Sequence, residues 1–427
     1  GFVFALLRYG IALLPAVALR VNSKKVAAVV SLGVAWFYLQ LSGANVATER
    51  AFIMVIVMLG AVLLDRRALS LRTVAISATI LLLMQPETLL EPGFQMSFAA
   101  TTALIAGFGA LEGSVARGRV PRWAIPVFTL VLSSLLAGIA TAPFGAAHFN
   151  RIADFGFIAN LLTVPVMGAI VMPAGAVAAL LAPLGLADLP LWVMGRGSAW
   201  ILWVAHQVAT WDGAVSAVPA PGPWVLPLIS LGGLWIVLWR GWPRIAGIAP
   251  IAVAFVLWAG VDRPGVLISA DGALVGVLGP EGRALSAAKG AGFAAKSWLE
   301  NDGDLNDQIA AAERSGFDGP KTRRSFHIGA WRAVQLKGKA APDSFAAACA
   351  EADLVIIAAK VTANAGNCRV IDLDLLGQTG GIALWLAEDG TLRLQPSRIA
   401  SRLWTGKGQP GTVSDLVLPT AKLAGTP

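Results

Sequence analysis

The feature that most constrains this chain is a series of apolar segments of spanning or nearly spanning length, separated by short polar loops. A helix needs about 20 apolar residues to cross the hydrocarbon core of a bilayer. Only 14% of the 427 residues are charged, whereas soluble domains carry about 25%. The apolar segments lie at 2–19, 26–41, 51–64, 73–84, 94–111, 124–142, 157–181, 191–211, 223–239 and 245–260. The sequence therefore predicts an α-helical polytopic membrane domain over residues 1–260, with about ten transmembrane segments.

The composition changes after Trp258, and residues 261–427 have the pattern of a soluble α+β domain. Residues 266–285 alternate apolar and polar side chains around two turns, which is typical of short antiparallel strands. Residues 345–360 predict a helix followed by a buried strand, and residues 380–396 predict a hairpin around Asp389 and Gly390. The chain begins at Gly1, inside an apolar run and without an initiator Met. We therefore expect a piece of a longer protein that lacks its N-terminal region.

The charges of the loops predict how the membrane domain is oriented. Residues 1–260 hold 15 Lys and Arg against 8 Asp and Glu, whereas residues 261–427 hold 18 against 17. Alternate loops contain eleven basic residues: Arg20, Lys24, Lys25, Arg66, Arg67, Arg72, Arg117, Arg119, Arg122, Arg240 and Arg244. The intervening loops contain Arg50 and Arg151. Because basic loops remain in the cytoplasm, the C-terminal domain is predicted on the outer, periplasmic side. The same loops account for most of the net charge of +8, so this charge is only a weak indication of nucleic-acid binding.

Four polar motifs interrupt the apolar pattern, and all are predicted on or near the outer side. They are LSGANVATERAFIM (41–54) with Glu49 and Arg50, GFQMSF (93–98) with Gln95 and Ser97, TAPFGAAHFNR (141–151) with His148, Asn150 and Arg151, and FIANLLTVPVMGAIVMPAG (157–175) with Asn160, Pro165 and Pro173. The third motif is predicted to be a proline-broken outward loop. Polar groups and broken helices survive in a membrane only where protein or water satisfies them. The motifs together predict a polar cavity that opens outward.

The order of these motifs, with the basic loop at residues 65–67 between the first two, resembles the competence domain of the ComEC family of DNA-uptake channels. The resemblance covers residues 1 to about 240. It implies a multi-pass protein of the bacterial inner membrane that carries single-stranded DNA inward during natural transformation. It also implies a small domain before residue 1. The implied partners are membrane lipids, a periplasmic protein that delivers DNA and a cytoplasmic motor that pulls it, and a homo-oligomer stays open.

By this resemblance Arg50, Gln95, Ser97, Asn150 and Asn160 occupy patterned positions of the family. The candidates for the DNA path are Arg50, Glu49, Gln95, Ser97, Asn150, Arg151 and Asn160. Arg50 is expected to contact phosphates, and the amides to line a hydrated path or to bond bases. Structural alternatives remain, because Arg50 could pair with Glu49, Ser97 could cap a helix and Asn160 could bond a carbonyl freed by Pro165. Arg8 and Arg196 are expected to snorkel or to pair within the bundle.

Many relatives of this kind end in a metallo-β-lactamase-like domain, and such a domain requires a cluster of histidines to bind metal. The C-terminal domain contains His327 and no other histidine. We therefore predict either a diverged module of that type or another module, with no cofactor. Asp302 and Asp304 are weak metal candidates, because their spacing also describes a turn. The basic run from Lys321 to Arg324 could bind phosphate or be a solvated surface.

Cys349 and Cys368 are the two cysteines of the chain. They flank the predicted buried strand and are candidates for a disulfide if the domain lies in the oxidising periplasm. The favoured function is a channel for single-stranded DNA without a catalytic step. Two alternatives are a membrane-anchored nuclease or hydrolase acting through the C-terminal domain, and a transporter of a small polar solute.

Overall fold

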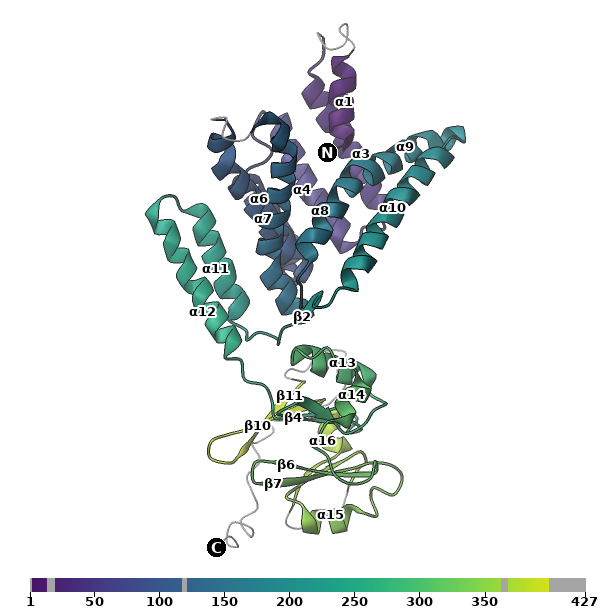
Figure 1. Cartoon of the computed structure of the whole chain (residues 1–427), viewed down its shortest axis with the longest axis vertical. Coiled ribbons are helices and arrows are strands. Elements are labelled where there is room, and N and C mark those ends of the chain that lie inside the picture. Colours follow the sequence, from purple (N-terminus) through teal and green to yellow (C-terminus); the bar gives the residue numbers. More distant parts are fainter. Residues whose placement is uncertain (1, 14–19, 117–120, 362–367, 399–427) are drawn as a thin grey trace. The chain divides into compact units, whose positions relative to one another are not determined.

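The computed structural model describes residues 2–13, 20–116, 121–361 and 368–398, and they form two compact units (Figure 1). The helical unit comprises Gly1–Ser216 and Pro223–Val256. The C-terminal unit comprises Leu257–Pro427 together with Ala217–Gly222. The second unit therefore includes a short segment that the sequence pattern assigns to the membrane domain.

The helical unit consists of apolar helices joined mostly by short connections. They are α1 (Phe2–Ala12), α3 (Ser23–Leu41), α4 (Val46–Leu63), α5 (Leu71–Met84), α6 (Pro92–Ala116), α7 (Ile125–Phe149), α8 (Gly156–Val166), α9 (Met172–Leu181), α10 (Asp188–Ala209), α11 (Val225–Leu238) and α12 (Ile248–Ala259). Short 3-10 turns are η1 (Pro86–Leu90), η2 (Arg122–Ala124), η4 (Ala182–Leu184) and η5 (Trp242–Gly247), and the π turn η3 is Met167–Val171.

Six helical stretches of the described chain are long and apolar enough to cross a bilayer. They are Ser23–Leu41, Val46–Leu63, Pro92–Leu111, Ile125–Phe149, Gly156–Leu184 and Trp242–Ala259, and the helices α1, α5 and α11 are apolar but shorter. A multi-pass membrane domain is therefore confirmed, whereas a total of ten crossings stays a prediction. Residues 14–19 of the first predicted segment lie outside the described residues.

Side-chain caps explain where two helices begin. The Asn45 side chain accepts a hydrogen bond of 3.0 Å from the Thr48 backbone N–H, and α4 starts at Val46. The predicted start at residue 51 was therefore wrong by about one turn, because hydropathy does not detect a polar cap. As a consequence, Glu49 and Arg50 lie in the first turns of α4. Ser70 and Thr73 form a reciprocal capping box at the start of α5.

The predicted proline-broken loop at 141–151 was also wrong, because α7 continues through Pro143 to Phe149. In an apolar environment a helix satisfies its own backbone groups, and this outweighs the one hydrogen bond that proline removes. The helix ends instead at Asn150, whose φ of 56° is left-handed. By contrast, the irregularity predicted in 157–175 is present, because the π turn η3 follows Pro165.

Helices α4, α5 and α6 share a buried cluster made of Ile53, Leu81, Phe94 and Phe98. Phe94 and Phe98 are four residues apart on α6, and their ring centroids are 4.4 Å apart. Two aromatic residues of the motif GFQMSF thus anchor the start of α6 against α4 and α5. Its polar residues are left to face elsewhere.

The C-terminal unit contains two sheets. The antiparallel sheet has the order β11-β10-β3-β4-β5, and the mixed sheet has the order β6-β7-β8-β9. Their strands are β3 (Val266–Ile268), β4 (Val275–Gly279), β5 (Gly282–Leu285), β6 (Arg323–Ile328), β7 (Trp331–Leu336), β8 (Leu354–Ile357), β9 (Arg369–Ile371), β10 (Ile382–Leu386) and β11 (Leu392–Pro396). Its helices in the described ranges are α13 (Gly292–Asn301), α14 (Gln308–Glu313), α15 (Phe345–Glu351) and α16 (Leu373–Thr379).

The sheets pack face to face, because residues of both, such as Ile268 and Leu384 from one and Phe326 and Trp331 from the other, belong to one buried cluster. Helices α13 and α14 cover the outer face of the antiparallel sheet, and α15 covers that of the mixed sheet (Figure 1). The predicted α+β fold is confirmed, including the hairpin in which Leu386 pairs with Leu392.

Candidate functional site

Several helix ends of the helical unit meet at one end of the bundle. The Gln85 Nε2 atom, just after α5, donates a hydrogen bond of 3.2 Å to Oε2 of Glu49 at the start of α4. The opposite end of α4 carries the basic loop, where Lys25 Nζ lies 2.7 Å from the Asp65 carboxylate. The polar motifs and the basic loops therefore occupy opposite ends of α4, as the topology prediction requires.

The Arg50 guanidinium lies directly against Gly93 at the start of α6. A Cβ atom on residue 93 would stand 2.7 Å from Arg50 Nη1, 3.1 Å from Nη2 and 3.2 Å from Cζ. Because Gly93 has no side chain, the Arg50 guanidinium can lie against its backbone. Arg50 is half-buried, and the Glu91 carboxylate acts on it electrostatically. Glu49 bonds Gln85 instead, and no ion pair joins Glu49 to Arg50 in this described segment.

Gln95 connects α6 to α7. Its Nε2 atom donates to the Leu89 carbonyl at 2.9 Å, and its Oε1 atom lies 2.8 Å from Nε2 of His148. Because an amide oxygen can only accept, His148 donates from Nε2 in this pair. Gln95 thus uses both ends of its amide to fix the start of α6 against the last turn of α7. Polar pairs of this kind are typical of helix contacts within membranes.

Asn150 and Arg151 lie at the same end, immediately after α7. Asn150 caps the helix, and Arg151 begins strand β1 (Arg151–Ala153), which pairs with β2 (Val215–Ala217). The Ser216 hydroxyl donates a hydrogen bond of 2.7 Å to the Asp154 carboxylate. This small sheet therefore connects the loop after α7 with the loop after α10.

Ser97 is half-buried within α6, five residues after the first residue of that helix, so it does not cap the helix. Its carbonyl accepts a hydrogen bond of 2.8 Å from the Thr101 hydroxyl. Within the described part of the chain, no hydrogen bond joins the Ser97 side chain to Arg50, Glu49 or Gln95.

Asn160 is exposed on α8, and among the described residues no hydrogen bond involves its side chain. The Trp200 indole of α10, not Asn160, bonds a carbonyl near Pro165, donating to Leu162 at 3.3 Å. The structure brings Glu49, Arg50 and Gln95 together through Gln85, Gly93 and His148, but shows no link from this group to Asn160. Arg196 is exposed on α10.

Sequence reasoning missed Gln85 and Gly93 and treated His148 as an isolated loop residue. A signal for Gly93 was available in the motif GFQMSF. The phenylalanines of this motif are core residues and the other side chains include polar ones, so the motif marks a helix start that packs closely against its neighbours. For Gln85 and His148 the signal was weaker, since their partners are 36 and 53 residues away along the chain.

Residues 1–243, which contain all of these motifs, match the sequence profile of the family described as "Competence protein". The chain belongs to this family. It is also 31% identical over 147 residues to "ComE operon protein 3" of Bacillus subtilis (strain 168). That alignment covers 34% of this chain and 17% of the relative. No solved structure matches the chain.

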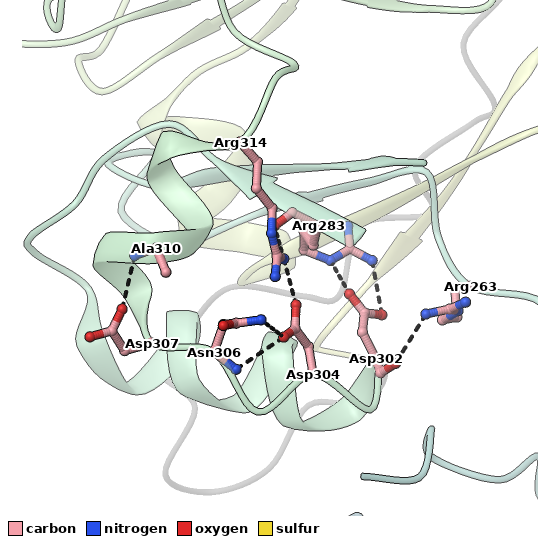
Figure 2. A network of polar contacts seen from close by, with 8 residues as sticks. All are labelled: Arg263, Arg283, Asp302, Asp304, Asn306, Asp307, Ala310 and Arg314. Atoms are coloured by element: carbon pink, nitrogen blue, oxygen red, sulfur yellow. Dashed lines mark hydrogen bonds and ion pairs between the residues drawn. The ribbon is translucent and has the colours of Figure 1, made fainter. Parts of the chain in front are cut away.

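The family match ends at residue 243, before the main part of the C-terminal unit (Leu257–Pro427). In that part Asp302 and Asp304 have structural partners (Figure 2). Arg283 is fully buried and holds Asp302 by two hydrogen bonds, Nε to Oδ2 at 2.5 Å and Nη2 to Oδ1 at 3.2 Å. Its Nη2 and Nη1 atoms also donate to the carbonyls of Pro264 and Gly276. A buried, bidentate pair with its remaining donors satisfied is a structural clamp.

Asp304 is bound in the same way, by Arg314 and Asn306 (Figure 2). Burial opposes ionisation of this carboxyl, but the hydrogen bonds from Arg314 and Asn306 outweigh it and hold the Asp304 pKa below its ordinary value. The oxygen atoms of Asp302 and Asp304 therefore already have donors. In the described part of the chain, no three His, Cys, Asp or Glu residues group as metal ligands would.

The loop that follows α13 also holds the segment Ala217–Gly222. The Ala220 N–H donates to the Asn301 carbonyl at 2.8 Å, and the Trp258 indole donates to the Pro219 carbonyl at 2.8 Å. Gly303 has a φ of +73°, and a Cβ atom there would lie 2.8 Å from the Pro219 nitrogen. The clamp of Arg283 on Asp302 thus shapes a loop that packs against this segment.

Cys349 of α15 and Cys368 before β9 form a disulfide in the structure, with their Cα atoms 5.3 Å apart. Both sulfur-bearing residues are buried in the cluster between α15 and the outer face of the mixed sheet. This arrangement brings together the two residues that the sequence pairs. The oxidation state of the protein in the cell stays a prediction.

Proposed function

We propose that this chain is a channel that moves single-stranded DNA through the bacterial inner membrane into the cytoplasm during natural transformation. Membership of the competence family supports this assignment. The match to the B. subtilis protein covers a small share of that relative, so the activity, the ten crossings, the periplasmic delivery protein and the cytoplasmic motor all belong to the proposal.

The observation that carries the proposal is the position of the Arg50 guanidinium on Gly93. Glu49 does not neutralise this half-buried cation, and Glu91 acts on it electrostatically without an ion pair among the described residues. Such a cation is suited to contact a phosphate at the entrance of a channel. The Glu49 carboxylate accepts a hydrogen bond of 3.2 Å from Gln85. The hydrogen bond between Gln95 and His148 fixes α6, the helix that carries Gly93. In this proposal Glu49 and Gln95 position the entrance, and Arg50 contacts the strand.

The C-terminal unit lies on the periplasmic side in this proposal. In this proposal the loop between α10 and α11, which contributes Ala217–Gly222 to that unit, lies on the same side of the bilayer. The same loop contains β2, which pairs with β1 next to Arg151. The proposal assigns the polar end of the helical unit to the periplasm because the positive-inside rule assigns the basic loops to the cytoplasm.

The test measures uptake of fluorescent DNA by competent cells that carry a clean deletion of the gene and a plasmid copy. Arg50→Ala is expected to lower uptake at least about tenfold if the guanidinium contacts phosphates in the transport step. Arg50→Lys, which keeps the charge, is expected to retain part of the uptake. The matched control is Arg66→Ala, which removes an exposed charge at the opposite end of α4.

Normal uptake by the deletion strain would disprove the channel. Normal uptake by Arg50→Ala, at wild-type levels of inserted protein, would disprove the assigned contact. The alternative C-terminal nuclease predicts that the purified chain cleaves DNA with a divalent metal ion and that Asp302→Ala abolishes the cleavage. The bonds from Arg283 to both Asp302 oxygens give no support to that alternative.

A further inference from the structure

Basic residues at the β6–β7 end of the mixed sheet fall into two classes. Arg323 lies 2.5 Å from the Glu351 carboxylate of α15, and Arg332 lies 3.7 Å from Asp353. Lys321, Arg324 and Lys337, by contrast, form no ion pair within the described ranges. The second class requires an explanation, because like charges that are close together repel.

The strand register places Arg324 and Lys337 on the same face. Arg324 is paired with Gln335 across the ladder, and it lies two residues before Phe326, so both side chains are on the strand face that is buried between the two sheets. The Lys337 N–H donates to the Thr322 carbonyl at 3.0 Å, so the antiparallel pairing continues one step beyond β7. Lys337 follows Gln335 by two residues and is therefore a diagonal neighbour of Arg324 on the face between the sheets.

The charges at this position are both positive and partly removed from water. Lys337 is half-buried. Burial lowers the pKa of Lys337, and the nearby positive charges of Arg324 and Lys321 lower it further. A cluster of three cations in this environment is unfavourable alone and becomes favourable when an anion binds between them.

The polar groups beside the cations also include atoms without partners. Arg324 Nη1 donates to the Gly319 carbonyl at 2.9 Å, which fixes the guanidinium, whereas its Nε is buried with no hydrogen-bond partner in the described structure. Gln335 Nε2 donates to the Gly272 carbonyl at 2.8 Å, and its Oε1 is buried and likewise unpartnered. Buried polar atoms of native proteins are usually satisfied, so an unpartnered guanidinium N–H at a cationic cluster indicates a ligand that accepts hydrogen bonds.

We propose that Lys321, Arg324 and Lys337 form a phosphate site that binds the backbone of a nucleic-acid strand. The Arg324 guanidinium and the two ammonium groups donate charge-assisted hydrogen bonds to phosphate oxygens. Contacts with phosphates carry no sequence information, so binding is expected to be independent of sequence. The identity of the ligand as DNA rests on the proposed function, whereas the phosphate chemistry rests on the cluster itself.

The experiment uses the purified full chain in detergent and labels its lysines with an amine-reactive reagent, which mass spectrometry then maps. A 20-nucleotide DNA strand and an abasic phosphodiester of the same length are both expected to protect Lys321 and Lys337. An uncharged methylphosphonate strand is expected to protect neither. Exposed Lys296 of α13 is the internal control and should label equally throughout.

Two neighbouring substitutions separate the site from general charge. Arg324→Gln is expected to raise the strand concentration for half-protection about fivefold, because it removes one charge-assisted contact. Arg323→Gln removes the same charge from the adjacent residue, whose side chain faces outward to Glu351, and should change it less than about twofold. Because Lys321 is exposed, Lys321→Gln provides a second variant that should leave folding intact.

Three results would each overturn the proposal. The DNA strand could fail to protect the lysines, the methylphosphonate strand could protect them, or Arg323→Gln and Arg324→Gln could have equal effects. Protection by inorganic phosphate as strong as that by the strand, at equal phosphate concentration, would overturn the assignment to a strand. A negative result leaves the channel untouched, since the Arg50 uptake assay tests that function in the helical unit independently.

Discussion

Arg50 of α4 lies so close to Gly93 of α6 that a Cβ atom on residue 93 would stand 2.7 Å from its Nη1 atom. The atom displaced would be the tip of a flexible side chain, so Gly93→Ala should cost little stability. It should nevertheless move the guanidinium. We predict that Gly93→Ala lowers DNA uptake several-fold, as Arg50→Ala does. The level of inserted protein and its unfolding temperature should equal those of wild type.

The control for this prediction is Gly109→Ala on the same helix, since a Cβ atom there has no neighbour within 4 Å. Uptake should equal wild type in that variant. If Gly93→Ala and Gly109→Ala behave alike in the uptake assay, the position of the Arg50 guanidinium does not matter for transport.

The Gln95–His148 hydrogen bond of 2.8 Å should stabilise the contact between α6 and α7. We expect Gln95→Ala and His148→Ala each to destabilise the protein by about 1 kcal/mol, with a coupling energy of about 0.6 kcal/mol in the double-mutant cycle. Thermal unfolding in detergent provides the measurement. Strictly additive effects of the two substitutions would show that the side chains do not interact.

The fold was predictable from the sequence where the signal is local. Helices such as α6 follow from apolar length, and the hairpin of β10 and β11 follows from alternation around Asp389 and Gly390. The start of α4 was placed too late because a cap is a single polar residue, here Asn45. The loop predicted around Pro143 failed because the rule for proline in water was applied within an apolar helix.

The candidate site was only partly predictable for a different reason. The motifs identified Arg50 and Gln95, because polar residues in apolar helices are conspicuous. Their contacts with Gly93 and His148 depend on which helices become neighbours, which no local pattern encodes. Asn160 shows the limit of this reasoning, since it belongs to a motif of the same kind, yet among the described residues no hydrogen bond joins its exposed side chain to the others.

The Cys349–Cys368 disulfide closes a loop between residues 19 apart. Cross-linking a loop of that length should stabilise the C-terminal unit by about 3 kcal/mol, chiefly by restricting the unfolded chain. Cys349→Ser and the double variant with Cys368→Ser should therefore unfold at the same temperature, below that of wild type. Reductant should lower the unfolding temperature of wild type to the same value. Thiol labelling of unbroken cells gives a second readout, because free thiols in wild type would contradict an oxidised, periplasmic unit.

Acid should loosen the loop around Asp304, because Arg314 and Asn306 hold the pKa of this carboxyl below its ordinary value of 3.8. A depressed pKa contributes stability that is present above pH 3.8 and is lost as the pH falls through the lower folded value. We predict that the protection factors of the amides in residues 298–314, corrected for the intrinsic exchange rate at each pH, fall over this range in wild type. Asp304→Asn should exchange faster than wild type at neutral pH and should show little further change on acidification. Asp343→Asn, which alters an exposed carboxyl elsewhere in the unit, should keep the wild-type profile. An unchanged profile in Asp304→Asn would show that the pair with Arg314 does not stabilise this loop.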